Sequence, residues 1–325
     1  MKRLVLTLLA LAVAVLFAAF AGQRANAISR QEDVIRDLTT VFSEPSAFPP
    51  NNALRPFFNG PTNQVRQPYG FDIGPGREDR PETLPVRGFR FVVALIENEQ
   101  PAQEGYVCAG ALIAPEWVLT AAHCTYAWTQ RWPFQPEVYA LFDTARLAEP
   151  GPRVRVLQVI PHPAYDPHTL RNDVALLRIA KDQIRAPPIQ LEGPPPSEQV
   201  GAIGHVLGWG VTNTAPAERR ATEALQVLQV LVRDPDACFA GYNFPQLRGS
   251  GAFCASSLLR YHDICYRFGG GPLFLRDKKG ARYLAGLVSW PAVCPPAKDK
   301  MNAFLDVQRY VPWIKSTIQA NGGPG

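Results

Sequence analysis

The sequence predicts an all-β protein, and three observations support this class. From Arg90 onwards, short runs of Val, Ile, Leu, Tyr and Phe alternate with polar residues, as half-buried strands do. Turn-forming residues separate these runs at short intervals. The 32 prolines among 325 residues disfavour long helices. With 46% apolar residues, the chain can bury a large core in one or two domains.

Residues 1–27 have the features of a signal peptide. Lys2 and Arg3 precede an almost wholly apolar run from Leu4 to Ala21, and Ala25-Asn26-Ala27 forms a small-residue cleavage site. The run is also long enough to serve as an uncleaved membrane anchor, but the cleavage site favours removal. We therefore expect a secreted or periplasmic protein that meets a membrane only if this segment is not cleaved.

The charge pattern argues against a nucleic-acid ligand. The formal net charge of +5 falls by three to +2 once residues 1–27 are removed, and the basic residues are scattered. No sequence motif indicates a cofactor. Six cysteines in an exported chain favour disulfides, and no CxxC pair predicts a metal site. The order of the cysteines alone leaves 15 pairings open.

Residues 28–90 are expected to lie outside the β-rich region. Ser29 and Glu32 form a capping box for an amphipathic helix over residues 29–42. Its apolar stripe either docks on the body of the protein or binds a partner. The Pro- and Asn-rich residues 43–90 predict an extended linker or strap.

The remaining chain predicts strands and one terminal helix. The expected strands are Phe91–Glu97, Tyr106–Ile113, Arg153–Ile160, Leu225–Val232 and Tyr283–Trp290. A helix is expected over residues 307–320, capped by Asp306 and ended by Asn321-Gly322. Its predicted buried face is Val307, Tyr310, Val311, Ile314 and Ile318.

Several motifs occur in the order found in one protease family. Residues 117–124 read W-V-L-T-A-A-H-C, residues 172–179 read N-D-V-A-L-L-R-I, and residues 206–210 read V-L-G-W-G. Residues 263–274 read D-I-C-Y-R-F-G-G-G-P-L-F, close to D-x-C-x-G-D-S-G-G-P. Over residues 90–320 the chain thus resembles the trypsin/chymotrypsin-like serine proteases.

The resemblance implies two packed antiparallel six-stranded β-barrels, over residues 91–188 and 189–306, with a C-terminal α-helix and tail over 307–325. It implies disulfides Cys108–Cys124, Cys238–Cys254 and Cys265–Cys294. It also places the base of a catalytic triad on His123 and the carboxylate that orients this base on Asp173.

The nucleophile loop departs from the family pattern at three successive positions. The resemblance places the nucleophilic Ser on Gly269, the preceding Asp on Phe268, and one oxyanion-hole residue on Arg267, the other being Gly269 itself. Gly269 has no oxygen that could form an acyl-enzyme. Arg267 is expected to turn its N–H away or to lay its guanidinium across the oxyanion hole.

Other family positions concern the substrate cleft. Ser289, Trp290 and Pro291 correspond to its rim, where Pro291 lacks the N–H that pairs with substrate. Asp263 and Asn302 correspond to the specificity pocket. Asp263 either binds Arg or Lys or is paired internally, with Asn302 or Arg267. Ser250, Ser256, Ser257 and Ser289 match no nucleophile position.

The sequence therefore favours an exported serine-protease homologue without proteolytic activity that binds a peptide or protein partner. One alternative is a serine endopeptidase with Arg or Lys preference, based on His123, Asp173 and Asp263. Another is an envelope scaffold that presents residues 28–90.

Overall fold

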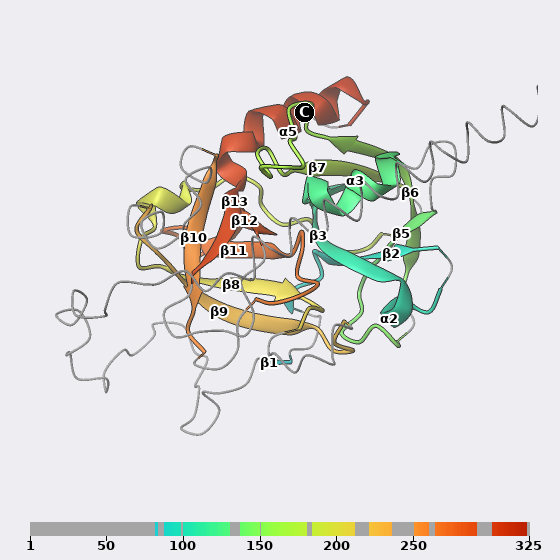
Figure 1. Cartoon of the computed structure of the whole chain (residues 1–325), viewed down its shortest axis with the longest axis horizontal. Coiled ribbons are helices and arrows are strands. Elements are labelled where there is room, and N and C mark those ends of the chain that lie inside the picture. The colour runs from blue at the N-terminus through green and yellow to red at the C-terminus, as the bar shows by residue number, and fades with distance from the viewer. Residues whose placement is uncertain are drawn as a thin grey trace, which may run out of the picture. The chain divides into compact units, whose positions relative to one another are not determined.

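A computed structural model describes the β-rich part of the chain (Figure 1). The described residues are 82–83, 88–98, 100–130, 137–149, 151–180, 184–211, 221–235, 250–259, 264–290 and 301–323. The predicted signal peptide, the expected helix at 29–42, Asp263, Pro291, Cys238 and Cys294 lie outside them. Within these ranges, no helix has the length and apolar character needed to cross a bilayer.

Six antiparallel strands close the first barrel. Their order around the barrel is β2-β3-β4-β7-β6-β5, and β5 pairs back to β2. These strands are β2 (Val92–Glu97), β3 (Tyr106–Ala114), β4 (Trp117–Thr120), β5 (Val138–Leu141), β6 (Arg153–Pro161) and β7 (Ala175–Ile179). Every residue of β4 is buried, and every residue of β2 except the last is buried. Their side chains pack either inside the barrel or against the elements outside it.

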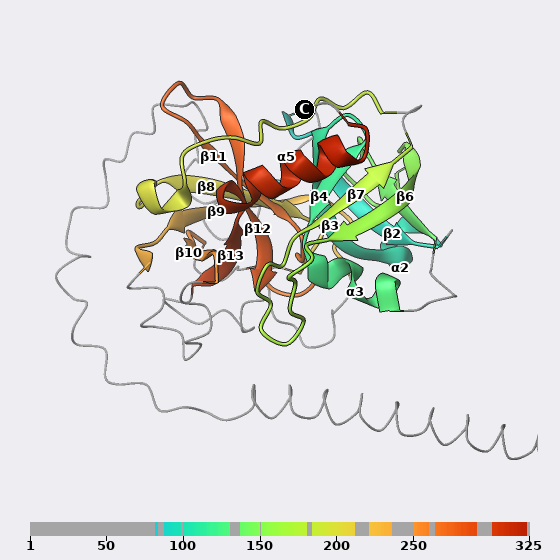
Figure 2. The ribbon, with the colours of Figure 1, turned by 90° about the horizontal axis from the view of Figure 1, so that it is seen from above.

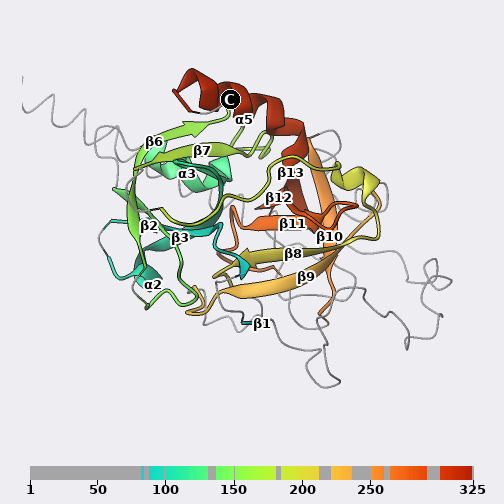
Figure 3. The same cartoon turned by 180° about the vertical axis from the view of Figure 1, so that it is seen from behind.

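Six further strands close the second barrel, in the order β8-β9-β10-β13-β12-β11, with β11 pairing back to β8. They are β8 (Ile203–Gly208), β9 (Gln226–Val232), β10 (Ala252–Ser257), β11 (Pro272–Arg276), β12 (Arg282–Trp290) and β13 (Asn302–Asp306). A two-residue strand, β1 (Glu82–Thr83), adds to β9. The two barrels lie next to each other in Figures 1 and 3. The predicted fold class is confirmed.

The helices are short. Within the described residues they are α2 (Ala102–Gly105), α3 (Ala122–Gln130), the 3-10 helices η3 (Pro196–Glu198) and η5 (Val307–Tyr310), and α5 (Val311–Ala320). The single C-terminal helix that we predicted is thus two elements. Pro312 occupies the first turn of α5, where its missing N–H breaks no hydrogen bond. Asp306 caps η5 as expected, by accepting a hydrogen bond from Gln308 N.

The C-terminal helix follows the last strand of the second barrel but packs on the first (Figure 2). Ile314 and Ile318 are buried in one apolar cluster with Trp117 and the strands of the first barrel. Val311, which we expected on the buried face, is only half-buried, because it begins α5 and borders an open pocket beside Pro312. The helix therefore joins the two halves of the β-rich region.

Candidate active-site cleft

The first feature of the cleft is an imidazole held by a buried carboxylate. His123 lies in the first turn of α3, directly after β4, and Asp173 lies two residues before β7. Because β4 and β7 pair, both residues leave the barrel at the same end. His123 N lies 2.7 Å from Asp173 Oδ1, and His123 Nδ1 lies 2.8 Å from Asp173 Oδ2. Nε2 is therefore the ring nitrogen left to face the cleft.

A third donor completes this network. Ser289, on β12 of the second barrel, donates its hydroxyl to Asp173 Oδ2 at 2.5 Å. Asp173 is fully buried, whereas the His123 side chain is 29% exposed. Burial lowers the pKa of His123, but the charge of Asp173 and its hydrogen bond raise it by more, so this pKa lies above its ordinary value. The site can hold a proton on an imidazole next to a buried anion.

The nucleophile loop places Gly269 directly against this imidazole. Its carbonyl accepts a hydrogen bond from Ala109 N of β3 at 2.9 Å, and Gly270 N donates to Val288 O at 2.9 Å. A Cβ built on Gly269 would lie 2.5 Å from His123 Nε2 and 3.1 Å from Cys108 Sγ. Position 269 thus lacks a hydroxyl, and the imidazole occupies part of the space that a side chain would need.

Phe268 fixes the loop from the other side. Its ring is fully buried in the core of the second barrel, with Val206, Ile264 and Leu273 among its neighbours in that cluster. The ring also lies over two glycines: a Cβ on Gly208 or Gly210 would come within 2.9 Å or 2.2 Å of it. Apolar burial therefore holds this part of the loop, at the position where the resemblance expects an aspartate.

Arg267 joins the loop to the first barrel. Its φ of +65° is left-handed, a conformation that costs a residue with a Cβ about 1–2 kcal/mol relative to Gly. Two contacts hold it there: Arg267 Nη1 donates to Tyr106 O at 2.6 Å, and the Tyr106 hydroxyl donates to Arg267 O at 3.1 Å. Tyr106 is fully buried and packs edge-on against Trp209. The guanidinium is thus engaged by the carbonyl of β3.

Comparisons with known proteins decide the family. The sequence model of the Trypsin family matches residues 82–314. The chain belongs to the trypsin family. Human serine protease 1 is 31% identical over 233 residues, which are 69% of this chain and 87% of that relative. Coagulation factor XII of Sus scrofa is 32% identical over 64% of this chain, but only 35% of that longer protein is matched.

A solved structure, that of HL collagenase, supports the same assignment. It is 26% identical, has a TM-score of 0.59, and covers 74% of this trypsin-family chain and 98% of its own. The family resemblance that the motifs predicted is therefore confirmed. The roles of the individual site residues in this chain remain predictions.

One of the three predicted disulfides is described completely in this trypsin-family chain. Cys108 on β3 is bonded to Cys124 on α3, as expected. Cys254 and Cys265 are also disulfide-bonded, and their predicted partners Cys238 and Cys294 lie outside the described residues.

The remaining cleft positions are partly described. Asn302 is fully buried at the start of β13, opposite Ala255 of β10. The backbone of Trp290 ends β12 opposite Ala303. Asp263 and Pro291 lie outside the described residues, so the cation-binding and internally paired interpretations of Asp263 both stay predictions.

The structure adds a residue that the motifs did not indicate. Tyr106 lies 161 positions before Arg267 in the sequence. Arg267 belongs to the 263–274 motif, but Tyr106 lies outside every motif named above. The only available signal was the exchange of Gly for Arg in the nucleophile loop, since a left-handed Arg needs compensating contacts.

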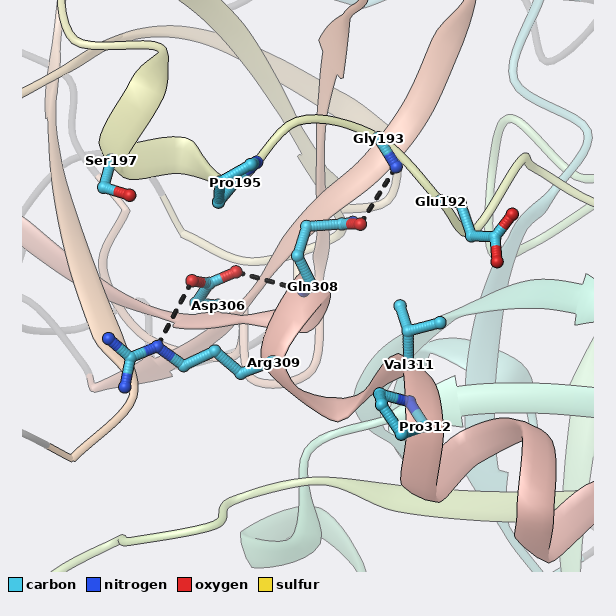
Figure 4. A pocket seen from close by; sticks show the side chains of 9 residues that line it. All are labelled: Glu192, Gly193, Pro195, Ser197, Asp306, Gln308, Arg309, Val311 and Pro312. Carbon is cyan, nitrogen blue, oxygen red and sulfur yellow. Dashed lines mark hydrogen bonds and ion pairs between the residues drawn. The ribbon is translucent and has the colours of Figure 1, made fainter.

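A cavity of about 570 Å³ lies away from the cleft, between the connection of the two barrels and η5 (Figure 4). None of His123, Asp173 and Gly269 lines it. Its buried carboxylate, Asp306, accepts from Gln308 N and lies 3.5 Å from Arg309 Nε. The Gln308 amide in turn accepts from Gly193 N and donates to the carbonyl of Leu191. The hydrogen bonds of Gln308 thus hold η5 against the segment that connects the two barrels.

Proposed function

We propose that this chain is an exported trypsin-family protein that does not cleave peptide bonds and acts by binding a peptide or protein partner. The observation that carries the proposal is Gly269 at the nucleophile position, with His123 Nε2 only 2.5 Å from the place of a Cβ. Acyl transfer in this family begins when a hydroxyl attacks the scissile carbonyl. Here the imidazole has no hydroxyl to deprotonate.

Loss of the nucleophile alone leaves a family site with roughly 10³–10⁴-fold catalysis over water, which depends on the oxyanion hole and on substrate binding. In this chain the Arg267 position carries a bulky residue tied to Tyr106. A substrate carbonyl would have to approach beside that side chain. This change lowers the expected residual hydrolysis further.

Binding is supported by aromatic side chains near the loop and the imidazole. Tyr266, directly before Arg267, is 44% exposed, and Tyr126, one turn after His123 on α3, is 41% exposed. Tyr126 also packs edge-on against Tyr165. Tyrosines are frequent anchors of protein interfaces, because they bury a large area at low entropic cost. Export is supported by the predicted signal peptide and by the disulfides.

A second candidate function is favoured by one observation. The network of Ser289, Asp173 and His123 is complete across both barrels, and a buried carboxylate is costly to keep unless it is used or fully paired. This network suits a serine-type endopeptidase with Arg or Lys preference and unusual catalysis. The scaffold hypothesis for residues 28–90 has no comparable observation in its favour.

Peptide hydrolysis by the purified mature chain, residues 28–325, separates the two candidates. We expect no turnover of Arg- or Lys-containing peptides above the buffer rate, for the native chain and for His123→Ala alike. Turnover by the native chain that disappears in His123→Ala would reject the inactive homologue.

An immobilised peptide library tests binding. The affinity for captured peptides should fall at least tenfold in Tyr266→Ala and stay unchanged in Leu258→Ala, an exposed apolar control directly after β10. Equal losses in both variants, or none in either, would count against the cleft as the binding site.

A further inference from the structure

We propose that the Cys108–Cys124 disulfide is a redox-active centre of the cleft, which exchanges with low-molecular-weight thiols or cysteine-containing peptides, and that His123 stabilises the thiolate released. Such exchange would be an activity independent of peptide-bond cleavage and of the binding function proposed above. It uses the His–Asp pair that remains after the loss of the nucleophile.

The geometry places the disulfide where a substrate would meet the imidazole. The two sulphur atoms and a ring nitrogen of His123 lie within 4.8 Å of one another. His123 Nε2 is 3.5 Å from Cys124 Sγ. Cys108 Sγ borders the position of the missing Gly269 side chain, at 3.1 Å from a Cβ built there. On this side, therefore, the group next to Cys108 Sγ is the His123 imidazole and not a side chain at position 269.

These positions assign different roles to the two sulphurs. An incoming thiolate attacks Cys108 Sγ from the side of Gly269, forms a mixed disulfide there, and breaks the bond to Cys124. Cys124 leaves as a thiolate beside His123 Nε2, which stabilises it when the imidazole carries a proton. A second thiolate then attacks the incoming group's sulphur and releases Cys108. Two external thiols are oxidised to one disulfide, and the protein disulfide takes up the two electrons.

Electrostatics favour this leaving group. A thiolate next to an imidazolium has a pKa well below the ordinary value of about 8.5, and a thiol of lower pKa leaves faster. Burial disfavours the protonated imidazole, but the charge of Asp173 and its hydrogen bond favour it by more, so the pKa of His123 lies above its ordinary value. The Cys124 thiolate, the His123 imidazolium and the Asp173 carboxylate would then form a row of alternating charges.

The other disulfides provide an internal reference. Cys254 is fully buried and Cys265 is 3% exposed, while Cys108 and Cys124 are 6% and 8% exposed. These four exposed fractions are all below 10%, so the four described cysteines differ little in their access to solvent. A large difference in rate that His123→Ala abolishes would therefore report the effect of His123.

The test is limited reduction of the purified mature chain by glutathione or dithiothreitol, with EDTA present. Free thiols are alkylated at intervals and located by peptide mass spectrometry. We expect the Cys108–Cys124 disulfide to open at least about tenfold faster than the disulfides that contain Cys254 and Cys265. His123→Ala should slow this opening about tenfold, whereas His168→Ala, at an exposed histidine, should leave it unchanged.

A second measurement keeps the proposal testable if His123→Ala does not fold. In the reduced native chain, the thiolate absorbance near 240 nm should show one thiol that titrates below pH 7. Two thiols titrating at or above about pH 8.5 would overturn the proposal. Equal reduction rates for all the disulfides, or an unchanged rate in folded His123→Ala, would overturn it as well.

Discussion

At the scale of single residues, the three exchanges in the nucleophile loop form one consistent set. Phe268 provides apolar burial where the family pattern has a carboxylate, and it fits because Gly208 and Gly210 leave room for its ring. In family members that carboxylate receives a new N-terminus after activation, and residues 43–90 contain no Ile-Val-Gly-Gly sequence to supply one. A new N-terminus is not needed as an ion-pair partner for Phe268, because its uncharged ring fills the buried space by apolar packing.

Replacing Phe268 tests this interpretation. We expect Phe268→Asp to lower the free energy of unfolding by about 3–5 kcal/mol, because it buries an unpaired carboxylate and leaves a cavity. Phe268→Leu, a smaller apolar residue, should cost less than about 2 kcal/mol. Urea unfolding followed by fluorescence measures both. A loss below about 1 kcal/mol for the aspartate would show that position 268 reaches water or a hidden cation.

Gly269→Ser concerns the chemistry directly. This single change should not restore appreciable peptide cleavage, because its Cβ would lie 2.5 Å from His123 Nε2 and would displace the imidazole from Asp173. Gly269→Ala, which lacks the hydroxyl, is the matched control, and its rate of peptide cleavage should equal that of Gly269→Ser. Initial rates on an Arg-containing peptide decide the outcome. Robust cleavage by the serine variant alone would contradict our account of the loop.

At the scale of elements, the contact between the barrels depends on a few segments. The nucleophile loop touches β3 through the reciprocal Arg267–Tyr106 hydrogen bonds and through Ala109 N, which donates to Gly269 O. The C-terminal helix α5 crosses from the second barrel to the core of the first. The cleft residues His123 and Ser289 come from different barrels, so these contacts also set the geometry of the site.

The contribution of α5 to the free energy of unfolding can be measured by shortening one of its buried side chains. Ile318 is 4% exposed within the core of the first barrel. Ile318→Ala should lower the free energy of unfolding by about 2–4 kcal/mol, from lost apolar burial and the cavity left behind. Gln319→Ala, at an exposed neighbour, should change it by less than about 0.5 kcal/mol. Similar values for both variants would mean that α5 does not stabilise the β-rich region.

At the scale of the whole molecule, the motifs predicted much of the fold, and local patterns predicted less. The five strands expected from alternation are present, each with one end shifted by one residue. The seven other barrel strands were not predicted from local patterns: β4, β5, β7, β8, β10, β11 and β13. Each has only four to six residues and is defined by its partners across the barrel, which a local pattern does not contain. The short helix α3 was not predicted, since only its first three residues fall in the 117–124 motif, for which we predicted no secondary structure.

For the site, as for the fold, the motifs predicted the main residues but not the contacts that depend on how the barrels pack. The motifs indicated His123, Asp173 and the empty nucleophile position, and the structure brings the three together. They did not indicate Tyr106 or the closeness of Cys108 Sγ to position 269, since both depend on how the two barrels pack. Contacts between residues more than 150 positions apart follow from the fold and not from the neighbouring sequence.

Acid stability is a property of the whole molecule to which one partly buried histidine contributes. His205 on β8 stacks on Phe274 of β11, with ring centroids 5.0 Å apart. Burial, and then the charges of Arg276 and Arg282, lower its pKa from 6.5 to about 4. As the pH falls from about 6.5 to 4, the unfolded chain takes up a proton at His205 and the folded chain does not. The stability present above pH 6.5 is therefore lost through this window, by an amount on the order of 3 kcal/mol.

We expect His205→Phe, which keeps the ring stacking, to remove this part of the acid dependence. The difference in free energy of unfolding between the variant and the native chain should grow by about 2–3 kcal/mol between pH 7 and pH 4. His123 cannot produce the same change, because its raised pKa contributes stability that is fully present below pH 6.5 and is lost as the pH rises through its folded value. Urea unfolding at a series of pH values measures the difference, with His168→Phe as the exposed control. If the two variants show the same pH dependence, His205 takes up its proton over the same pH range in the folded and unfolded chains, and its pKa is not lowered by folding.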